Sequence, residues 1–343
     1  MQVTIVGLDL AKNTFHVVCF NERFKELRKR MLRRHQVLLF FANLPSCCIG
    51  MEACSSSHYW GRELSKLGHE VKLIPPQHVK AFLRGNKNDY NDARAIAEAA
   101  TRPGISGVAV KTVEEQDMQA LHRMRSQCLR DRTALVNSTR GLLSEYGIVV
   151  PKGIASLRKS IPELLEDADN GLSILFRRLL AQRYDQLKEL DSHIKFYTNE
   201  LERSVQQDDA CQRLQTIPGF GPVVASAFRS AIGNGSAYSQ GRDVAASLGL
   251  VPRQHSTGGK NILLGISKRG DQYIRSLLVH GARAVVIQAV RKKDRLSNWL
   301  NRIREERGLN KAVVAMANKM ARMGWAILRH NSSYRVLSAA SGS

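Results

Sequence analysis

The sequence lacks the features that mark membrane-spanning, secreted and zinc-stabilised proteins. Its 343 residues contain no apolar run long enough to cross a bilayer, and residues 1–6 lack the charged and apolar regions of a signal peptide. Six cysteines are too sparse for a disulfide framework, and no CxxC pair indicates a zinc site. We therefore expect a cytoplasmic protein with reduced thiols and no membrane partner.

Acidic residues are also scarce. Asp and Glu number 30 against 52 Lys and Arg, which gives a formal net charge of +22. So basic a chain repels itself unless a polyanion neutralises it, and nucleic acid is the usual partner because each phosphate contact releases counterions. Hydrophobic residues make up 43% of the chain, enough for sizeable cores, and the length suggests two or three domains.

The first third of the chain alternates short apolar runs with helical patterns. Residues 2–10 and 14–20 predict a hairpin, and the basic stretch 23–34 predicts a third strand and a turn. Further strands are expected at 47–51 and 70–74, and helices at 58–68 and 90–101. This alternation predicts an α/β domain over residues 1–105.

The middle third has a different pattern. Apolar residues recur at helical spacing over 113–147 and 172–205, which predicts two long helices in a linker spanning residues 106–210. They could form a coiled coil suited to joining domains or subunits, or they could simply pack on a local core. Both alternatives fit the sequence.

The last third, residues 211–343, is expected to be mostly helical, with a final helix at 310–329. The segment IPGFGP (217–222) resembles a helix–hairpin–helix turn, in which Gly219 and Gly221 would present backbone N–H groups to phosphates. A tight turn between two helices is the alternative. The basic stretches 23–34 and 265–311 are candidate phosphate tracks.

Four carboxylates stand where an α/β catalytic site would need them. Asp9 follows the first strand, Glu52 follows a later one, and Asp89 and Asp92 share the start of a helix. Carboxylates gathered from distant points in a sequence repel one another unless a cation lies between them, and Mg²⁺ prefers oxygen ligands. Taken singly, each could be a turn cap, a solvated side chain or a helix N-terminal acid. Together they predict a divalent-metal site.

A second candidate site lies in PRQHSTGGK (252–260). Small residues there allow a phosphate to approach the backbone, and a hydroxyl could attack phosphorus. The hydroxyls of this segment are those of Ser256 and Thr257, and His255 beside Ser256 is a possible base. The candidate phosphate-binding residues are Arg253, Gly258, Gly259, Lys260, Lys268 and Arg269. A glycine-rich turn that only contacts DNA is the alternative.

Five motifs resemble one known family over nearly the whole chain. GLDLAK (7–12), GMEA (50–53) and KNDYNDARAIAEA (87–99) resemble the N-terminal domain of the insertion-sequence "one-ten" transposases, a family that includes the pilin-gene DNA invertases. PRQHSTGGK and LGISKRG (264–270) resemble its C-terminal transposase domain, in the branch called "eleven-eleven". The resemblance implies a ribonuclease-H-like, Holliday-junction-resolvase-like fold for residues 1–105. It also implies that Asp9, Glu52, Asp89 and Asp92 are the family's Mg²⁺-binding Asp-Glu-Asp-Asp set.

The resemblance further implies a serine that becomes covalently linked to DNA. Ser256 fits the spacing to the SKRG segment, and Thr257 fits if the spacing is counted from Pro252. We prefer Ser256, because a primary hydroxyl is less hindered. The family pattern also implies an active site shared between subunits of a dimer or tetramer, donor and target DNA, and a noncoding bridge RNA that guides both. Such a protein would lie in the cytoplasm of a bacterium, at the nucleoid.

Two other functions remain open. A metal-dependent nuclease of the junction-resolvase type would use water as the nucleophile and leave no protein–DNA adduct. A non-catalytic nucleic-acid-binding protein would use the acidic residues for another purpose, although the order of all four carboxylates argues against it.

Overall fold

The computed structural model describes the chain except for residues 1, 86–87, 106, 259 and 336–343, so Gly259 lies outside the described residues. Its contacts divide the chain into two units, Met1–Gln116 and Asp117–Ser343. Each unit is described by itself below. None of the helices within the described residues is long and apolar enough to cross a membrane.

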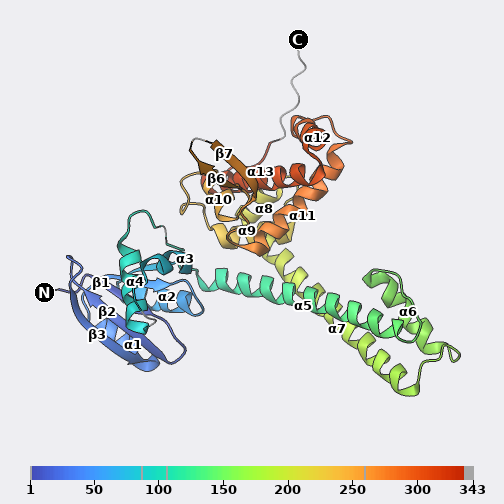
Figure 1. Ribbon diagram of the computed structural model, residues 1–343, viewed down its shortest axis with the longest axis horizontal. Coiled ribbons are helices and arrows are strands. Elements are labelled where there is room, and N and C mark those ends of the chain that lie inside the picture. Colours follow the sequence, from blue (N-terminus) through green and yellow to red (C-terminus); the bar gives the residue numbers. More distant parts are fainter. Residues whose placement is uncertain (1, 86–87, 106, 259, 336–343) are drawn as a thin grey trace, which may run out of the picture. The chain divides into compact units, whose positions relative to one another are not determined.

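The first unit is built on a five-stranded mixed sheet (Figure 1). Its strands are β1 (Ile5–Asp9), β2 (Thr14–Phe20), β3 (Glu26–Arg33), β4 (Cys48–Glu52) and β5 (Glu70–Ile74), in the order β3-β2-β1-β4-β5. β1, β2 and β3 pair antiparallel, whereas β4 runs parallel to both β1 and β5. The hairpin and the later strands predicted from the sequence are confirmed.

Helices cover both faces of this sheet. They are α1 (Val37–Ala42), α2 (Ser57–Lys66), α3 (Pro76–Val79) and α4 (Asp89–Thr101), with short 3-10 turns at Arg34–Gln36 and Lys80–Phe82. Strand residues such as Leu8 and Met51 share a core with Phe41 of α1 and Trp60 of α2. Val18 of β2 lies on the opposite face, with Ala93 and Ala97 of α4. The unit therefore has three layers.

Two glycines allow α4 to lie very close to the sheet. A Cβ atom on Gly7 would lie 1.8 Å from the carbonyl oxygen of Ala93, and one on Gly50 would lie 2.8 Å from the Cβ of Ala100. Any side chain at Gly7 would push the helix away. The small residues of β1, β4 and α4 thus fix the distance between helix and sheet.

The second unit begins with an arm of three helices, α5 (Val113–Ser144, whose first turn belongs to the first unit), α6 (Ile154–Glu166) and α7 (Ile174–Gln207). α5 and α7 run antiparallel, since Arg125 bonds Thr198 and Arg132 bonds Asp191. In this register Val136 lies opposite Leu187, and these residues share one core. The buried residues Leu180, Leu187, Ile194 and Leu201 of α7 recur every seven positions, a spacing typical of coiled coils. The two predicted long helices are confirmed.

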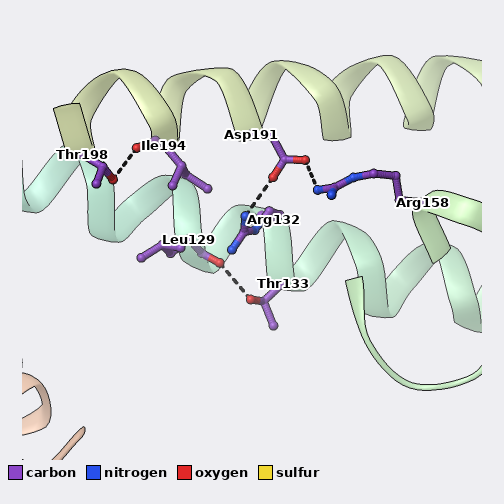
Figure 2. A network of polar contacts seen from close by, with 7 residues as sticks. All are labelled: Leu129, Arg132, Thr133, Arg158, Asp191, Ile194 and Thr198. Atoms are coloured by element: carbon purple, nitrogen blue, oxygen red, sulfur yellow. Dashed lines mark hydrogen bonds and ion pairs between the residues drawn. The ribbon is translucent and has the colours of Figure 1, made fainter. Parts of the chain in front are cut away.

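Asp191 ties the three arm helices together (Figure 2). One carboxylate oxygen accepts a hydrogen bond from Arg132 Nη1 of α5 at 2.8 Å, and the other accepts one from Arg158 of α6. Since the Asp191 side chain is 25% exposed, this network is partly shielded from water. It fixes α6 against the antiparallel pair.

The rest of the second unit is a helical body around one core, formed by residues 208–330. Its helices are α8 (Asp209–Gln215), α9 (Pro222–Ile232), α10 (Gly241–Ser247), α11 (Gln272–Ala289), α12 (Arg295–Arg307) and α13 (Leu309–His330). The central helix is α13, which contacts α8, α9, α10, α11 and α12. Two strands, β6 (Pro252–Thr257) and β7 (Lys260–Ile266), form an antiparallel hairpin on this body (Figure 1).

A buried polar cluster joins the arm to the helical body. The ring of His122, on α5, has Nε2 3.0 Å from Ser226 Oγ of α9 and Nδ1 3.0 Å from Tyr273 Oη of α11. His122 is 4% exposed. Burial, with a smaller effect of Arg125, lowers the pKa of His122 to about 4, so the ring is neutral at pH 7.

Candidate metal centre and serine hairpin

Strand alternation directs the acidic side chains to one face of the sheet. Val6 and Leu8 of β1 point to the core with α1 and α2, so Gly7 and Asp9 point to the face that α4 covers. The same alternation in β4 places Gly50 and Glu52 on the α4 face. Because β1 and β4 are parallel neighbours, their carboxyl ends carry Asp9 and Glu52 to the same edge.

The first turn of α4 brings the other two carboxylates. Asn88 caps this helix by accepting a hydrogen bond from the backbone N–H of Tyr90 at 2.9 Å, and Asp89 and Asp92 follow it directly. Acidic side chains are favourable at a helix N-terminus, where the free N–H groups carry partial positive charge. Asp92 immediately precedes Ala93, the residue packed on Gly7, so the close approach of α4 sets its position.

A histidine that the sequence analysis did not single out completes the cluster. His16 of β2 is the cross-strand partner of Asp9, and one ligand atom from each of Asp9, His16 and Asp89 lies within 4.8 Å of the others. His16 Nδ1 is 3.4 Å from a carboxylate oxygen of Asp89. The signal was available, since a short hairpin that begins after Asp9 pairs it with a residue early in the second strand.

Burial and, after it, charge repulsion within the cluster disfavour ionisation of Asp9. Burial, followed by the carboxylates of Asp92, Asp89 and Glu52, raises the pKa of Asp9 to about 6. Burial and Asp92 also raise the pKa of Glu52. The structure therefore brings all four predicted carboxylates within electrostatic range of one another. A divalent cation would relieve this repulsion, and carboxylate oxygens are the ligands that suit Mg²⁺ or Mn²⁺.

The predicted nucleophile lies on the β6–β7 hairpin rather than in an irregular loop. Ser256 pairs with Asn261 across the hairpin, and Thr257 pairs with Lys260. The turn begins at Gly258, whose φ of +56° suits glycine. Every residue of β6 is exposed. Two glycines between residues of strand-forming pattern are a hairpin signal that the sequence analysis passed over.

Neighbouring residues on β6 point to opposite faces of the hairpin. Ser256 shares a face with Gln254, whose amide donates a hydrogen bond of 2.7 Å to Ser256 Oγ. His255 and Thr257 share the other face. An extended strand therefore directs His255 away from Ser256, so the idea that His255 serves as the base for Ser256 gains no support. Only one of Ser256 and Thr257 can face a given substrate.

The remaining predicted residues are spread over the helical body. Arg253 and Lys260 are exposed on the hairpin, and Lys268 and Arg269 are exposed just after it. Gly221 is exposed at the start of α9. Gly219 has a packing role, because a Cβ there would lie 2.9 Å from the carbonyl oxygen of Gly281 on α11. The tight-turn alternative thus accounts for Gly219, and phosphate binding at both glycines stays a prediction.

Comparison with known protein families covers both units. A model of the Transposase IS116/IS110/IS902 family matches residues 211–296. A second family model, described as a transposase of the DEDD type of IS110, matches residues 6–148. The first match includes the serine hairpin, and the second includes all four carboxylates.

Several curated proteins are similar over almost their full length. A probable family 20 transposase of Pseudomonas aeruginosa is 44% identical over 98% of this chain and 99% of its own. The transposase for insertion sequence element IS1111A of Coxiella burnetii is 41% identical, over 97% of this chain and 92% of its own. A pilin gene-inverting protein of Moraxella bovis is 23% identical over 97% of this chain and 98% of its own.

Proposed function

Since the chain belongs to the IS116/IS110/IS902 family of insertion-sequence transposases, we propose that it cuts and rejoins DNA through a metal-binding acidic site and a serine nucleophile. The family makes the protein an enzyme that acts on DNA. The roles of individual residues are our proposal. The observation that carries it is the gathering of three carboxylates, those of Glu52, Asp89 and Asp92, around Asp9 in a chain whose net charge is +22.

Asp9, Glu52, Asp89 and Asp92 would hold the metal, and His16 would either be a further ligand or orient Asp89. Mg²⁺ bound there would activate the attacking oxygen and stabilise the leaving oxygen. The raised pKa of Asp9 supports this assignment, because groups tuned by burial and like charge are typical of functional sites. The sheet order β3-β2-β1-β4-β5, with acids at the ends of β1 and β4, supports a ribonuclease-H-like fold for residues 1–105.

Ser256 would supply the nucleophile. Its oxygen would bond to a DNA phosphorus as a phosphorus–sugar-oxygen bond breaks, and its proton would be lost while the released sugar oxygen gains one. Attack by a DNA hydroxyl on the phosphoserine would reverse these changes and rejoin the strand. The phosphates that flank the reacting one would be bound by four basic side chains and two glycines: Arg253, Lys260, Lys268, Arg269, Gly258 and Gly259.

The assembly around these sites is part of the proposal. Residues 1–105 would be the catalytic domain, 106–210 a coiled-coil linker and 211–343 the transposase domain, and the seven-residue spacing of buried positions in α7 supports the linker assignment. The acidic site of one subunit would act with the serine of another in a dimer or tetramer. A noncoding bridge RNA would pair with donor and target DNA, for which a charge of +22 leaves ample capacity.

An adduct-trapping assay tests the nucleophile. Wild-type protein with any RNA it carries is mixed with Mg²⁺ and DNA of the element's ends, and a denaturant-resistant protein–DNA adduct is sought. Ser256→Ala should abolish the adduct, whereas Thr257→Ala should retain it. Asp9→Ala should abolish both the adduct and cleavage. An adduct lost only in Thr257→Ala would move the nucleophile by one residue and onto the other face of the hairpin.

A metal-dependent nuclease is the second candidate, because the acidic cluster alone suffices for hydrolysis. It would use water, so cleavage without an adduct that Ser256→Ala leaves unchanged would favour it over the serine mechanism.

A further inference from the structure

A basic groove lies on the helical body, and Ser256 is not among the residues that line it. It has a volume of about 1800 Å³ and is lined by residues of α10, the β6–β7 hairpin, α12 and α13. This volume exceeds the range of roughly 300–1,000 Å³ that is typical of small-ligand pockets. The groove is open and elongated along two helices, which suits an extended occupant.

Positively charged side chains outnumber negatively charged ones in the groove. Glu306 is the one acid among its described lining residues, and its carboxylate is 4.0 Å from Arg302 Nε. The cations that line the groove are Arg242, Arg302, Arg307, Lys311, Lys319 and Arg322. Cations gathered without matching carboxylates repel one another, so the groove complements a polyanion.

Lys319 illustrates the mutual repulsion of the cations in the groove. Its ammonium lies 4.5 Å from the centre of the Trp299 ring, which holds it within the groove. Burial and then the charges of Arg322 and Arg295 lower the pKa of Lys319. A bound phosphate would supply the negative charge that is missing there.

The hairpin gives the groove an apolar wall. Leu263 is 67% exposed and Leu264 is 48% exposed, and both line the groove with Ile266 of the same strand. A duplex keeps its bases stacked and presents phosphates and base edges to a protein, so the flat faces of its bases are not available to these leucines. An unpaired strand offers both phosphates and the flat faces of its bases.

We propose that this groove binds an unpaired segment of nucleic acid, with its phosphates on the cations of α12 and α13 and its bases against the apolar wall that β7 provides. The proposal stands apart from the serine mechanism, since neither Ser256 nor any of the four carboxylates lines the groove. DNA and RNA share the required chemistry, and the test distinguishes them.

Binding is measured by fluorescence anisotropy with full-length protein freed of nucleic acid, in EDTA so that no cleavage occurs. The probes are a labelled single-stranded DNA, the same sequence as RNA, and the DNA duplex. Lys311→Gln with Arg322→Gln should weaken single-strand binding at least tenfold, and Leu263→Ser should weaken it severalfold without affecting the duplex. The matched control is Arg178→Gln with Lys195→Gln, which removes the same charge from exposed positions of α7.

The proposal is supported if the groove variants lose more single-strand affinity than the control variant does. Whichever of the DNA and RNA probes binds the wild-type protein more tightly identifies the kind of strand that the groove binds. Equal loss in groove and control variants would overturn it, because the effect would then be one of net charge. So would unchanged single-strand binding in both groove variants, or a loss confined to the duplex. Ser256→Ala, measured in parallel, should bind as the wild type does, so failure of the serine mechanism leaves this test intact.

Discussion

At Asp9, burial and the negative charge of the neighbouring carboxylates both disfavour the ionised form. Its pKa of about 6, against 3.8 for an isolated carboxyl, means that the folded protein binds a proton more tightly than the unfolded chain. The stability of the metal-free protein should therefore fall as pH rises from about 4 to 6, and metal affinity should rise through the same window. Asp92→Asn should lower the pKa of Asp9, which carboxyl NMR titration of metal-free protein would measure.

The control for this titration is Asp117→Asn, at an exposed acid on α5. It should leave the pKa of Asp9 unchanged. If Asp92→Asn also leaves it unchanged, the carboxylates are not electrostatically coupled, and the argument for a shared metal loses its basis.

His122 gives a pH effect of opposite sign. Its pKa of about 4, below the ordinary 6.5, arises because the buried ring cannot readily accept a charge. The unfolded chain therefore binds more protons between pH 6.5 and 4, and stability should fall by roughly 3 kcal/mol as pH drops through that window. Urea unfolding at several pH values would show this slope. His122→Gln should flatten it, whereas the exposed His280→Gln should not; a slope that persists in His122→Gln would assign it to another group.

The sequence alone indicated the individual carboxylates of the candidate metal site, but not the other side chains that lie beside them in the structure. Asp9, Glu52, Asp89 and Asp92 could be found because strand ends and helix starts are visible in the pattern. His16 depended on the register of the first hairpin, and the Ser226–His122–Tyr273 cluster joins residues more than 100 positions apart. Neither register nor long-range packing can be read from local periodicity.

The packing of α4 on the sheet positions half of the acidic site. Gly7→Ala would place a Cβ 1.8 Å from the backbone oxygen of Ala93, so the helix must shift or the unit must unfold. We expect a loss of about 3 kcal/mol or more in unfolding free energy and a large loss of divalent-metal affinity. Thermal unfolding and calorimetric titration with Mn²⁺ would measure both.

Gly104→Ala is the matched control in the same unit, because a Cβ there would meet nothing within 4 Å. Gly50→Ala, with a contact of 2.8 Å to a side-chain atom, should lie between the two. Equal effects at Gly7 and Gly104 would mean that close helix packing does not set the site.

The elements differ in how far the sequence determined them. The strand at 70–74 and the long helices were predicted nearly to the residue, because their apolar spacing is regular over their whole length. The hairpin at Pro252–Ile266 was not, because its strands are exposed and show no burial pattern. The candidate nucleophile Ser256 thus lies on an element that could not be predicted from the spacing of apolar residues.

Across the whole molecule, a net charge of +22 should make DNA binding strongly dependent on salt. Six to ten phosphate contacts would cost a factor of roughly 10³–10⁵ in affinity between 50 and 200 mM salt. Anisotropy titrations of wild-type protein with duplex DNA over this range would give the slope. A nearly flat response would mean that few phosphates are contacted, and that the basic stretches 23–34 and 265–311 are merely solvated.

The two units should also be separable. The apolar clusters on both faces of the sheet are confined to the first 110 residues, and those of the arm and helical body begin at residue 135. A fragment of residues 1–116 therefore contains its whole core, and its size is sufficient for independent folding. It should unfold cooperatively, bind Mn²⁺ in a manner lost with Asp9→Asn, and form no adduct with DNA because it lacks the serine hairpin. A fragment that stays unfolded would show that its sheet depends on the second unit, and an adduct formed by it would place the nucleophile in the acidic domain.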